Sequence, residues 1–241
     1  MFVVQRKEMR CSVTSDGPAP PVICGSNKGQ HMIVGWYSHS LSLSLQPIQS
    51  CSDAVSDCNI LRFSWSSAAT SVSWNIHTMQ ISCSASWRPP TGCLQYFTGT
   101  SGTISSYNYE GGLHLANQLY SICVRSERGY CSIGYTAIDT DTFQVSGQNP
   151  GGTSAQGDGC TTDYIEIVGG GDSVGANTNY DRFCGNFFNL DPTSSAIVTI
   201  FTNLVPYRIG VVFDGSEIDT RPGTSSEYSK GFSLYYSQTA C

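Results

Sequence analysis

The sequence predicts an all-β fold, an antiparallel β-sandwich of the jelly-roll type that is stapled by disulfides. Charged residues form 12% of the 241 residues, against about 25% in ordinary domains. Ser, Thr, Gly, Tyr and Phe take their place, which favours short strands and turns over helices. The 11 cysteines include no CxxC pair and no His-rich tract, so they indicate a disulfide framework and an oxidising compartment.

The clearest single element is the stretch CTTDYIEIV at 160–168, followed by DRFCG at 181–185. A strand here places Ile165 and Ile167 on one face and Tyr164 and Glu166 on the other. A Gly-rich turn separates the two stretches, so the two cysteines bracket a hairpin that a disulfide can clamp. A stapled hairpin of this kind favours a binding protein over an enzyme.

The other expected strands are short, rich in Tyr, Ile, Val, Phe or Thr, and separated by turn clusters. With the hairpin strand they are Gln95–Thr98, Ser121–Arg125, Cys131–Ala137, Thr142–Val145, Tyr164–Val168, Ala196–Asn203, Ile209–Phe213 and Phe232–Tyr236. The last two strands alternate, so their odd or even positions share one face. Residues 147–159, 169–179 and 215–230 are polar and Gly-rich, and we expect them to be loops at the ends of the sandwich.

The first half is less regular. The sequence RPPTG at 88–92 predicts a linker, because Pro-Pro stiffens the chain and removes backbone donors. Residues 37–57 contain the low-complexity run SLSLSL. Its period of two is compatible with a strand, and a translated intron or an assembly artefact is the alternative hypothesis.

Net charge and terminal sequence limit the partners and the compartment. A net charge of −6 offers no footprint for nucleic acid and argues against an anionic membrane surface. No apolar run reaches the ~20 residues of a membrane span. Residues 1–10 lack the apolar core of a signal peptide. We therefore expect an extracellular protein whose signal peptide is missing from this chain; a cytosolic protein with reduced thiols is the alternative. The chain contains no N-x-S/T sequon.

Residues 93–241 carry a series of motifs that resembles the CUB domain family, β-sandwich modules of secreted and cell-surface proteins. The segment GTISSYNY at 102–109 is similar to the family's G-x-I-x-S-P-N-Y, with Tyr107 in place of Pro. The stretches CTTDYIEI at 160–167, FCG at 183–185 and GFSLYY at 231–236 match the third cysteine strand, the fourth cysteine and the closing strand. The resemblance implies a CUB-type sandwich over 93–241.

The amino-acid sequences of residues 92–99, 114–118 and 122–125 resemble segments typical of a group of secreted arthropod CUB proteins. Residues 21–32, PVICGSNKGQHM, resemble the C-G-x-N-x-G-x-H region of a preceding CUB domain. The resemblance thus implies that 1–87 is the C-terminal part of a first module, with a doubtful segment at 37–57, and that 88–92 links it to the complete module.

The resemblance also implies a disulfide pairing. The family's two bridges correspond to Cys93–Cys123 and Cys160–Cys184, and Cys11–Cys24 matches the second of these in the first module. Two further pairs, Cys58–Cys83 and Cys131–Cys241, can tie neighbouring strands to closing strands. Cys51 is left over, inside the doubtful segment.

Many CUB domains bind calcium through three carboxylates on converging loops, a ligand type that this hard cation prefers. Asp163 matches the middle ligand, and Asp214 lies near the late loop but off the usual position. The Glu is missing, since TFQVS at 142–146 contains none. The favoured interpretation is that Asp163 caps a turn and that Asp214 is solvated, so no cofactor is expected other than possible calcium at these two residues.

Three other patterns were weighed for chemistry. The GDSVG at 171–175 is similar to a serine protease motif, but no His base in register accompanies it. Asp139 and Asp141 are spaced like an EF-hand start, but the following residues do not continue the loop. Loop aromatics can form an interface, although Phe187 and Phe188 favour a packed corner. These aromatics are Tyr107, Tyr109, Tyr180, Phe187 and Phe188.

The function implied by the resemblance is non-catalytic, extracellular binding of a protein or glycan partner. An accessory region of a larger secreted protease is one alternative, and a protease domain in the full-length sequence would favour it. A structural component of extracellular matrix or cuticle is the other, and insolubility on tissue extraction would distinguish it.

Overall fold

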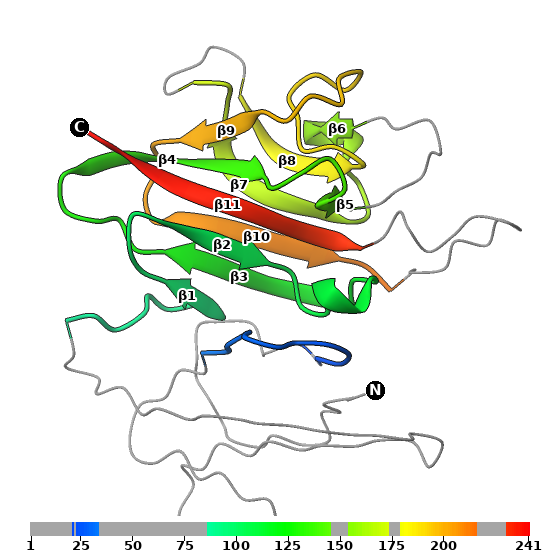
Figure 1. The fold of residues 1–241 in the computed structure, drawn as a ribbon, viewed down its shortest axis with the longest axis horizontal. Helices are drawn as coiled ribbons and strands as arrows, with labels where there is room; N and C mark the ends of the chain where they lie inside the picture. Colours follow the sequence, from blue (N-terminus) through cyan, green and yellow to red (C-terminus); the bar gives the residue numbers. More distant parts are fainter. Residues whose placement is uncertain (1–20, 22, 34–85, 146–153, 174–178, 216–229) are drawn as a thin grey trace, which may run out of the picture.

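Two β-sheets pack face to face in the computed structural model, which describes residues 21, 23–33, 86–145, 154–173, 179–215 and 230–241 (Figure 1). One sheet has the strand order β1-β3-β10-β7-β8-β6 and the other has the order β2-β11-β4-β9, with β5 also paired to β11. All strand pairs are antiparallel except β1 with β3. The strands are β1 (Gln95–Phe97), β2 (Ser101–Ser105), β3 (Gln118–Val124), β4 (Tyr130–Ala137), β5 (Phe143–Gln144), β6 (Ser154–Gln156), β7 (Tyr164–Gly170), β8 (Tyr180–Gly185), β9 (Thr199–Thr202), β10 (Tyr207–Phe213) and β11 (Gly231–Ala240).

The all-β prediction is confirmed, and each of the eight expected strands overlaps an observed one. The expected loop over 147–159 is wrong at its end, because β6 and the 3-10 turn η2 (Gly157–Gly159) occupy 154–159. The strand β2 was also missed. These two strands, SGTIS and SAQ, are short and lack a marked alternation of apolar residues, and pairing with β11 or β8 gives them their conformation.

The core lies between the sheets and follows the alternation in the sequence. Ile165 and Ile167 of β7 are fully buried, whereas Glu166 between them is exposed. The expected inward faces of β10 and β11 are buried as well. Each isoleucine side chain that leaves water in this way contributes roughly 1.5–3 kcal/mol, so alternation fixes which face of each strand points inward.

Three tyrosines fill one part of the core: Tyr135 on β4, Tyr207 on β10 and Tyr236 on β11. The Tyr236 hydroxyl donates a hydrogen bond to the Thr98 carbonyl oxygen, at 3.2 Å. The hydroxyls of Tyr135 and Tyr207 are buried and have no hydrogen-bond partner among the described residues. A buried hydroxyl without a partner costs free energy relative to an apolar group of the same shape.

We therefore expect Tyr135→Phe and Tyr207→Phe to leave the free energy of unfolding unchanged or to raise it by up to about 1 kcal/mol. Tyr236→Phe serves as the matched control and loses about 1 kcal/mol, because it removes a hydrogen bond. Urea unfolding of the three variants measures this. A loss of stability in Tyr135→Phe and Tyr207→Phe equal to that in Tyr236→Phe contradicts the unpartnered state of the two hydroxyls.

Three of the expected disulfides are present. Cys93–Cys123 joins the start of β1 to β3, Cys160–Cys184 joins the start of β7 to β8, and Cys131–Cys241 joins β4 to the chain end. Among the described cysteines only Cys24 is free. The other expected pair members, Cys11, Cys58 and Cys83, lie outside the described residues, so Cys11–Cys24 and Cys58–Cys83 stay predictions, as does the state of Cys51.

The predicted linker and the predicted doubtful segment both lie in the first half of the chain. Residues 88–92 form no helix or strand, and their role as a linker stays a prediction. Residues 37–57 lie outside the described residues. No helix among the residues described has the length and apolar character needed to cross a membrane.

Candidate binding surfaces

Asp163 and Asp214, the two calcium candidates, meet at one end of the sandwich. Asp163 precedes β7 and Asp214 follows β10, and because these strands are antiparallel the two residues lie at the same end. The Asp163 side chain is buried, and its Oδ1 accepts a hydrogen bond from the backbone N–H of Asp214 at 2.7 Å. Asp163 thus ties the entrance of β7 to the exit of β10.

Within the described ranges, no three His, Cys, Asp or Glu residues come together in a group that could hold a metal ion. Gln144 stands in the segment where the family's Glu was sought, and its side chain lies on β5. Asp163 and Asp214 offer two carboxylates at this end, and that of Asp163 already accepts a backbone hydrogen bond. Calcium takes six to eight oxygen ligands, so this pair does not form a calcium cage by itself.

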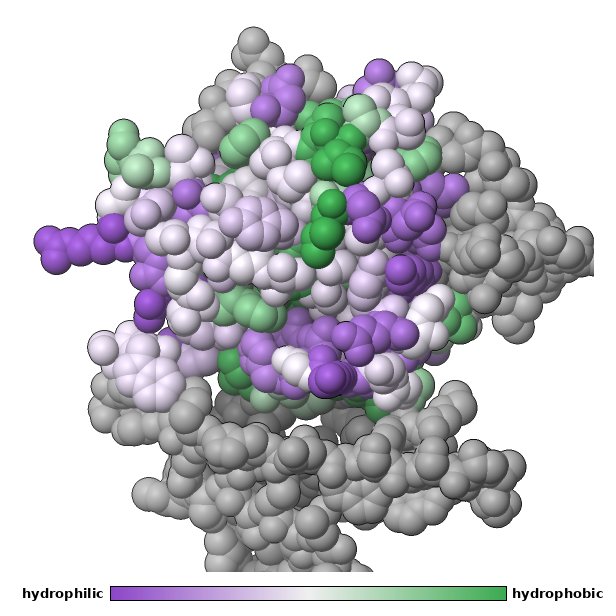
Figure 2. Space-filling view, in the orientation of Figure 1, coloured by the Kyte–Doolittle hydropathy of each residue, from purple (hydrophilic) through white to green (hydrophobic). Residues whose placement is uncertain are grey.

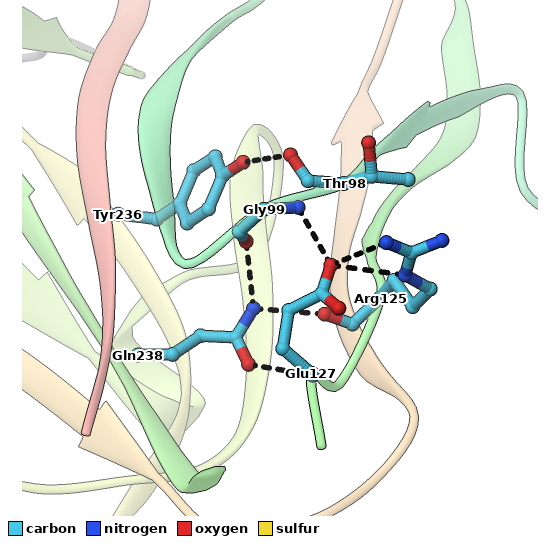
Figure 3. A network of polar contacts seen from close by, with 6 residues as sticks. All are labelled: Thr98, Gly99, Arg125, Glu127, Tyr236 and Gln238. Carbon is cyan, nitrogen blue, oxygen red and sulfur yellow. Dashed lines mark hydrogen bonds and ion pairs between the residues drawn. The ribbon is translucent and has the colours of Figure 1, made fainter. Parts of the chain in front are cut away.

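The most connected polar network lies at the opposite end, around Glu127 (Figure 3). Glu127 Oε1 accepts hydrogen bonds from Gly99 N at 2.7 Å and Arg125 Nε at 2.9 Å, and Arg125 Nη2 lies 2.8 Å from it. Gln238 completes the network, because its Oε1 accepts from Glu127 N and its Nε2 donates to the carbonyl oxygens of Gly99 and Arg125. The β1–β2 and β3–β4 connections are thereby fastened to β11.

The hydrogen bonds of this network connect Gly99, Arg125, Glu127 and Gln238 to one another, so its role is structural. The hydrogen bond from Arg125 is the main cause that lowers the pKa of Glu127, and the Gly99 N–H adds to it. A carboxyl whose pKa is lowered in the folded state contributes stability above its unfolded pKa of about 4.3. That contribution is lost as the pH falls through the lower, folded pKa.

We expect Glu127→Gln to be less stable than the wild type at pH 7, by less than about 1 kcal/mol because the pair is partly exposed and solvent screens it. The difference closes as the pH falls through the lowered, folded pKa of Glu127. Urea unfolding at pH 7 and through the acid range measures it. Asp158→Asn, at an exposed position, is the matched control for removing one carboxylate. A difference that persists in acid contradicts the charged role of Glu127.

Residues 23–33 lie along the free edge of β1 (Figure 1, blue). Ile33 N donates to the Leu94 carbonyl oxygen at 2.6 Å, and Tyr96 N donates to His31 Nε2 at 2.9 Å. The His31 ring meets Phe97 edge-on, with centroids 4.8 Å apart. Burial lowers the pKa of His31, which keeps the ring neutral and Nε2 free to accept. The edge donors of β1 are thus satisfied by this segment rather than left open.

Two residues of the 102–109 motif anchor the same segment. Tyr107 is buried against Tyr120, with ring centroids 5.1 Å apart, and its hydroxyl donates to the His31 carbonyl oxygen at 2.8 Å. Asn108 accepts from Ser26 N at 2.7 Å through Oδ1, and its own N–H donates to Asn27 Oδ1 at 2.8 Å. Tyr107, which replaces the Pro of the family motif, therefore holds residues 23–33 against the sandwich.

The remaining candidates are dispersed. Ser173 Oγ donates to the neighbouring Asp172 carboxylate on an exposed turn, with no described histidine beside it. Asp139 Oδ1 accepts from Asp141 N, so these two residues form a turn. Of the loop aromatics, Tyr107 and Phe188 are core residues and are not available for binding, whereas Tyr109, Tyr180 and Phe187 are partly exposed.

The outward face of the six-stranded sheet mixes apolar and charged side chains. The register aligns Leu119, Val212 and Tyr164 across β3, β10 and β7. Leu119 is 57% exposed, and the Arg182 guanidinium lies 4.7 Å from the centroid of the Tyr164 ring. Glu166 stands opposite Arg182 in the next row. Such a mixture of an exposed aliphatic group, an aromatic ring and charges is typical of protein interfaces.

The outward face of the β2-β11-β4-β9 sheet has a different character and carries no charge at its strand positions. Alternation and register place twelve residues outward, of which nine bear a hydroxyl on Ser or Thr. They are Ser101, Thr103, Ser105, Ser132, Gly134, Thr136, Thr199, Phe201, Ser233, Tyr235, Ser237 and Thr239. Three of them, Ser132, Gly134 and Ser233, are nevertheless buried. Figure 2 shows this face as a pale, nearly neutral field with a small apolar patch. We call it the hydroxyl face.

Seven of the twelve residues lie in strands expected from the sequence, but the hydroxyl face itself was not foreseen. Tyr235, Thr136 and Phe201 each alternate with buried neighbours, so their outward direction was readable from the sequence. The order of the strands in the sheet could not be read from the sequence, and this order brings the four strands together. The same holds for Arg182 and Tyr164, which meet only because β7 and β8 pair.

Comparison with known proteins finds a family model and solved structures that are similar to this chain. The family model described as animal CUB domain matches residues 90–239. Among solved structures, the chain is similar to the full extracellular region of zebrafish Gpr126/Adgrg6, with 18% sequence identity and a TM-score of 0.37. The match covers 63% of this chain and 15% of that chain. No curated protein matches the sequence.

Proposed function

The chain belongs to the animal CUB domain family, and from this premise we propose that it is a non-catalytic extracellular module that binds a protein or glycan partner. CUB domains are generally extracellular binding modules. In this proposal residues 93–241 are the complete module, residues 1–87 are part of a preceding one, and the relatives of the chain are secreted arthropod CUB proteins.

The observation that carries the proposal is the pair of outward sheet faces. Both hold side chains that stay exposed among the described residues, such as Leu119 at 57% and Tyr235 at 43% exposure. The three disulfides fix the sandwich beneath them. Rigid, preorganised faces lower the entropy cost of association, which suits binding. Asp163, Ser173 and His31 make structural hydrogen bonds, and Asp139 and Asp141 form a turn.

The test is saturable binding without turnover. The oxidised, full-length protein is applied to arrays of extracellular proteins and of glycans, and ligands that bind at micromolar concentration are recovered and analysed by mass spectrometry. We expect at least one saturable ligand, recovered with its mass unchanged, and loss of its binding after reduction of the disulfides. The absence of saturable binding to either class, or recovery of a cleaved ligand, contradicts the proposal.

A further inference from the structure

We propose that the hydroxyl face is a docking site for an extended, uncharged polysaccharide. This inference rests on the proposed binding function and deepens it by naming the face and the class of partner. The face consists of the twelve outward residues of β2, β11, β4 and β9 defined above. Three features of this face identify the partner: its aromatic rings, its ordered hydroxyls and its lack of charge.

Two aromatic rings lie on the face. Tyr235 stands at the centre of the row Thr103–Tyr235–Thr136–Thr199 and is 43% exposed. Phe201 is opposite Gly134, and a Cβ atom on Gly134 would come within 2.9 Å of the Phe201 ring. The ring therefore lies across the backbone of β4, where only glycine leaves room for it.

The spacing of the rings suits a long ligand. Tyr235 and Phe201 are separated by two strand intervals and by two residues along the strand. With strand intervals of about 4.8 Å and a rise of about 3.3 Å per residue, their Cα atoms are roughly 12 Å apart. That is about the length of an extended disaccharide. An aromatic ring offers a flat apolar surface against which the C–H groups of a sugar ring can pack.

Two cross-strand pairs of hydroxyls on the face are already ordered. Thr136 Oγ1 and Thr199 Oγ1 are 2.8 Å apart in the row of Tyr235. Ser105 Oγ donates to Ser233 Oγ at 2.9 Å on the side of Tyr235 away from Phe201, where Ser233 is buried. Each hydroxyl can donate one hydrogen bond and accept two, so the accessible groups of Thr136, Thr199 and Ser105 keep capacity for a ligand. Cross-strand hydrogen bonds hold these side chains in one conformation, which lowers the entropy that binding costs.

The charges select an uncharged ligand. None of the twelve positions carries a charge, and the whole chain has a net charge of −6. Sulfated, sialylated or uronic acid chains require basic partners, and the acidic chain repels them. The opposite sheet, with Arg182, Arg208 and Glu166 pointing outward, lacks this neutrality.

The experiment measures retention of the oxidised, full-length protein on microcrystalline cellulose and on chitin, with heparin–agarose as the anionic comparison. We expect saturable retention on at least one of the uncharged polysaccharides and none on heparin. Tyr235→Ala lowers the affinity about tenfold, as the loss of a central aromatic contact does. Tyr235→Phe keeps the ring and retains affinity within about threefold. Thr136→Glu, which puts a charge on the face, abolishes retention.

Tyr164→Ala is the matched control, since Tyr164 is a partly exposed tyrosine on the outward face of the other sheet. It leaves retention unchanged, and unchanged thermal unfolding shows that each variant is folded. Retention on neither polysaccharide overturns the inference, as does retention that survives Tyr235→Ala. Self-association that Tyr235→Ala abolishes, without retention, assigns the face to a second copy and also overturns it. If protein ligands bind but polysaccharides do not, the proposed function stands and only this inference falls.

Discussion

Replacing Cys160 and Cys184 together by alanine lowers the free energy of unfolding by about 3.5 kcal/mol, on the expectation that the bridge restricts the unfolded chain. The two cysteines are 24 residues apart and both are buried in the core. Loss of packing around them adds to the entropic effect. Urea unfolding without reductant measures the change. An unfolding midpoint equal to that of the wild type shows that the bridge adds nothing.

The Cys131–Cys241 bridge allows the contribution of loop entropy to be distinguished from that of core packing. Its cysteines are 110 residues apart and exposed, so loop closure alone gives about 4.8 kcal/mol with no loss of core packing. Loop closure alone therefore makes the removal of Cys131 and Cys241 more costly than that of Cys160 and Cys184, by about 1.3 kcal/mol. The reverse order means that the loss of core packing at Cys160 and Cys184 exceeds this difference in loop entropy.

Tyr107→Ala is expected to lower the free energy of unfolding by about 3–5 kcal/mol, the usual cost of emptying a buried aromatic site. The variant leaves a cavity beside Tyr120 and removes the hydrogen bond to the His31 carbonyl oxygen. Tyr107→Phe loses only that hydrogen bond, about 1 kcal/mol. Urea unfolding compares the two variants with Tyr109→Ala, the half-buried tyrosine of the same motif, which costs about 1 kcal/mol or less.

The anchoring role of Tyr107 has a local readout as well. Lys28 is exposed on the segment that Tyr107 holds, and cleavage by trypsin after Lys28 requires local opening of that segment. Tyr107→Ala increases the cleavage rate after Lys28 under native conditions, and Tyr109→Ala does not. Equal cleavage rates in the two variants contradict the assignment of Tyr107 as the anchor of residues 23–33.

Strands with strong alternation were predictable because burial dictates their residue types. The β7 sequence YIEIV places isoleucines inward at every second position, and β10 and β11 follow the same pattern. The strands β2 and β6 were not predictable, since SGTIS and SAQ are short and lack a marked alternation of apolar residues. Their conformation comes from partners distant in sequence, which a local pattern does not contain.

The candidate sites divide in a similar way. Asp163 accepts a hydrogen bond from Asp214 N, a residue far away in the sequence, and this contact was not foreseen. The interpretation of Asp163 as a turn cap and calcium binding at these two residues both stay predictions. The contact of residues 23–33 with β1 was not foreseen, because the motif resemblance assigns this segment to the preceding module. His31 meets Tyr96 only through the tertiary fold, and nothing in the spacing of 65 residues announces that contact.

Hydroxyl-radical footprinting of the protein on cellulose or chitin tests most directly whether this module binds through a sheet face. Tyr235 and Phe201 are the two aromatic side chains of the hydroxyl face, and Tyr164 reports on the opposite face. The account predicts that oxidation of Tyr235 and Phe201 falls when polysaccharide is bound, while oxidation of Tyr164 does not change. Protection of Tyr164 and Leu119 with Tyr235 still oxidised at the free rate would contradict it.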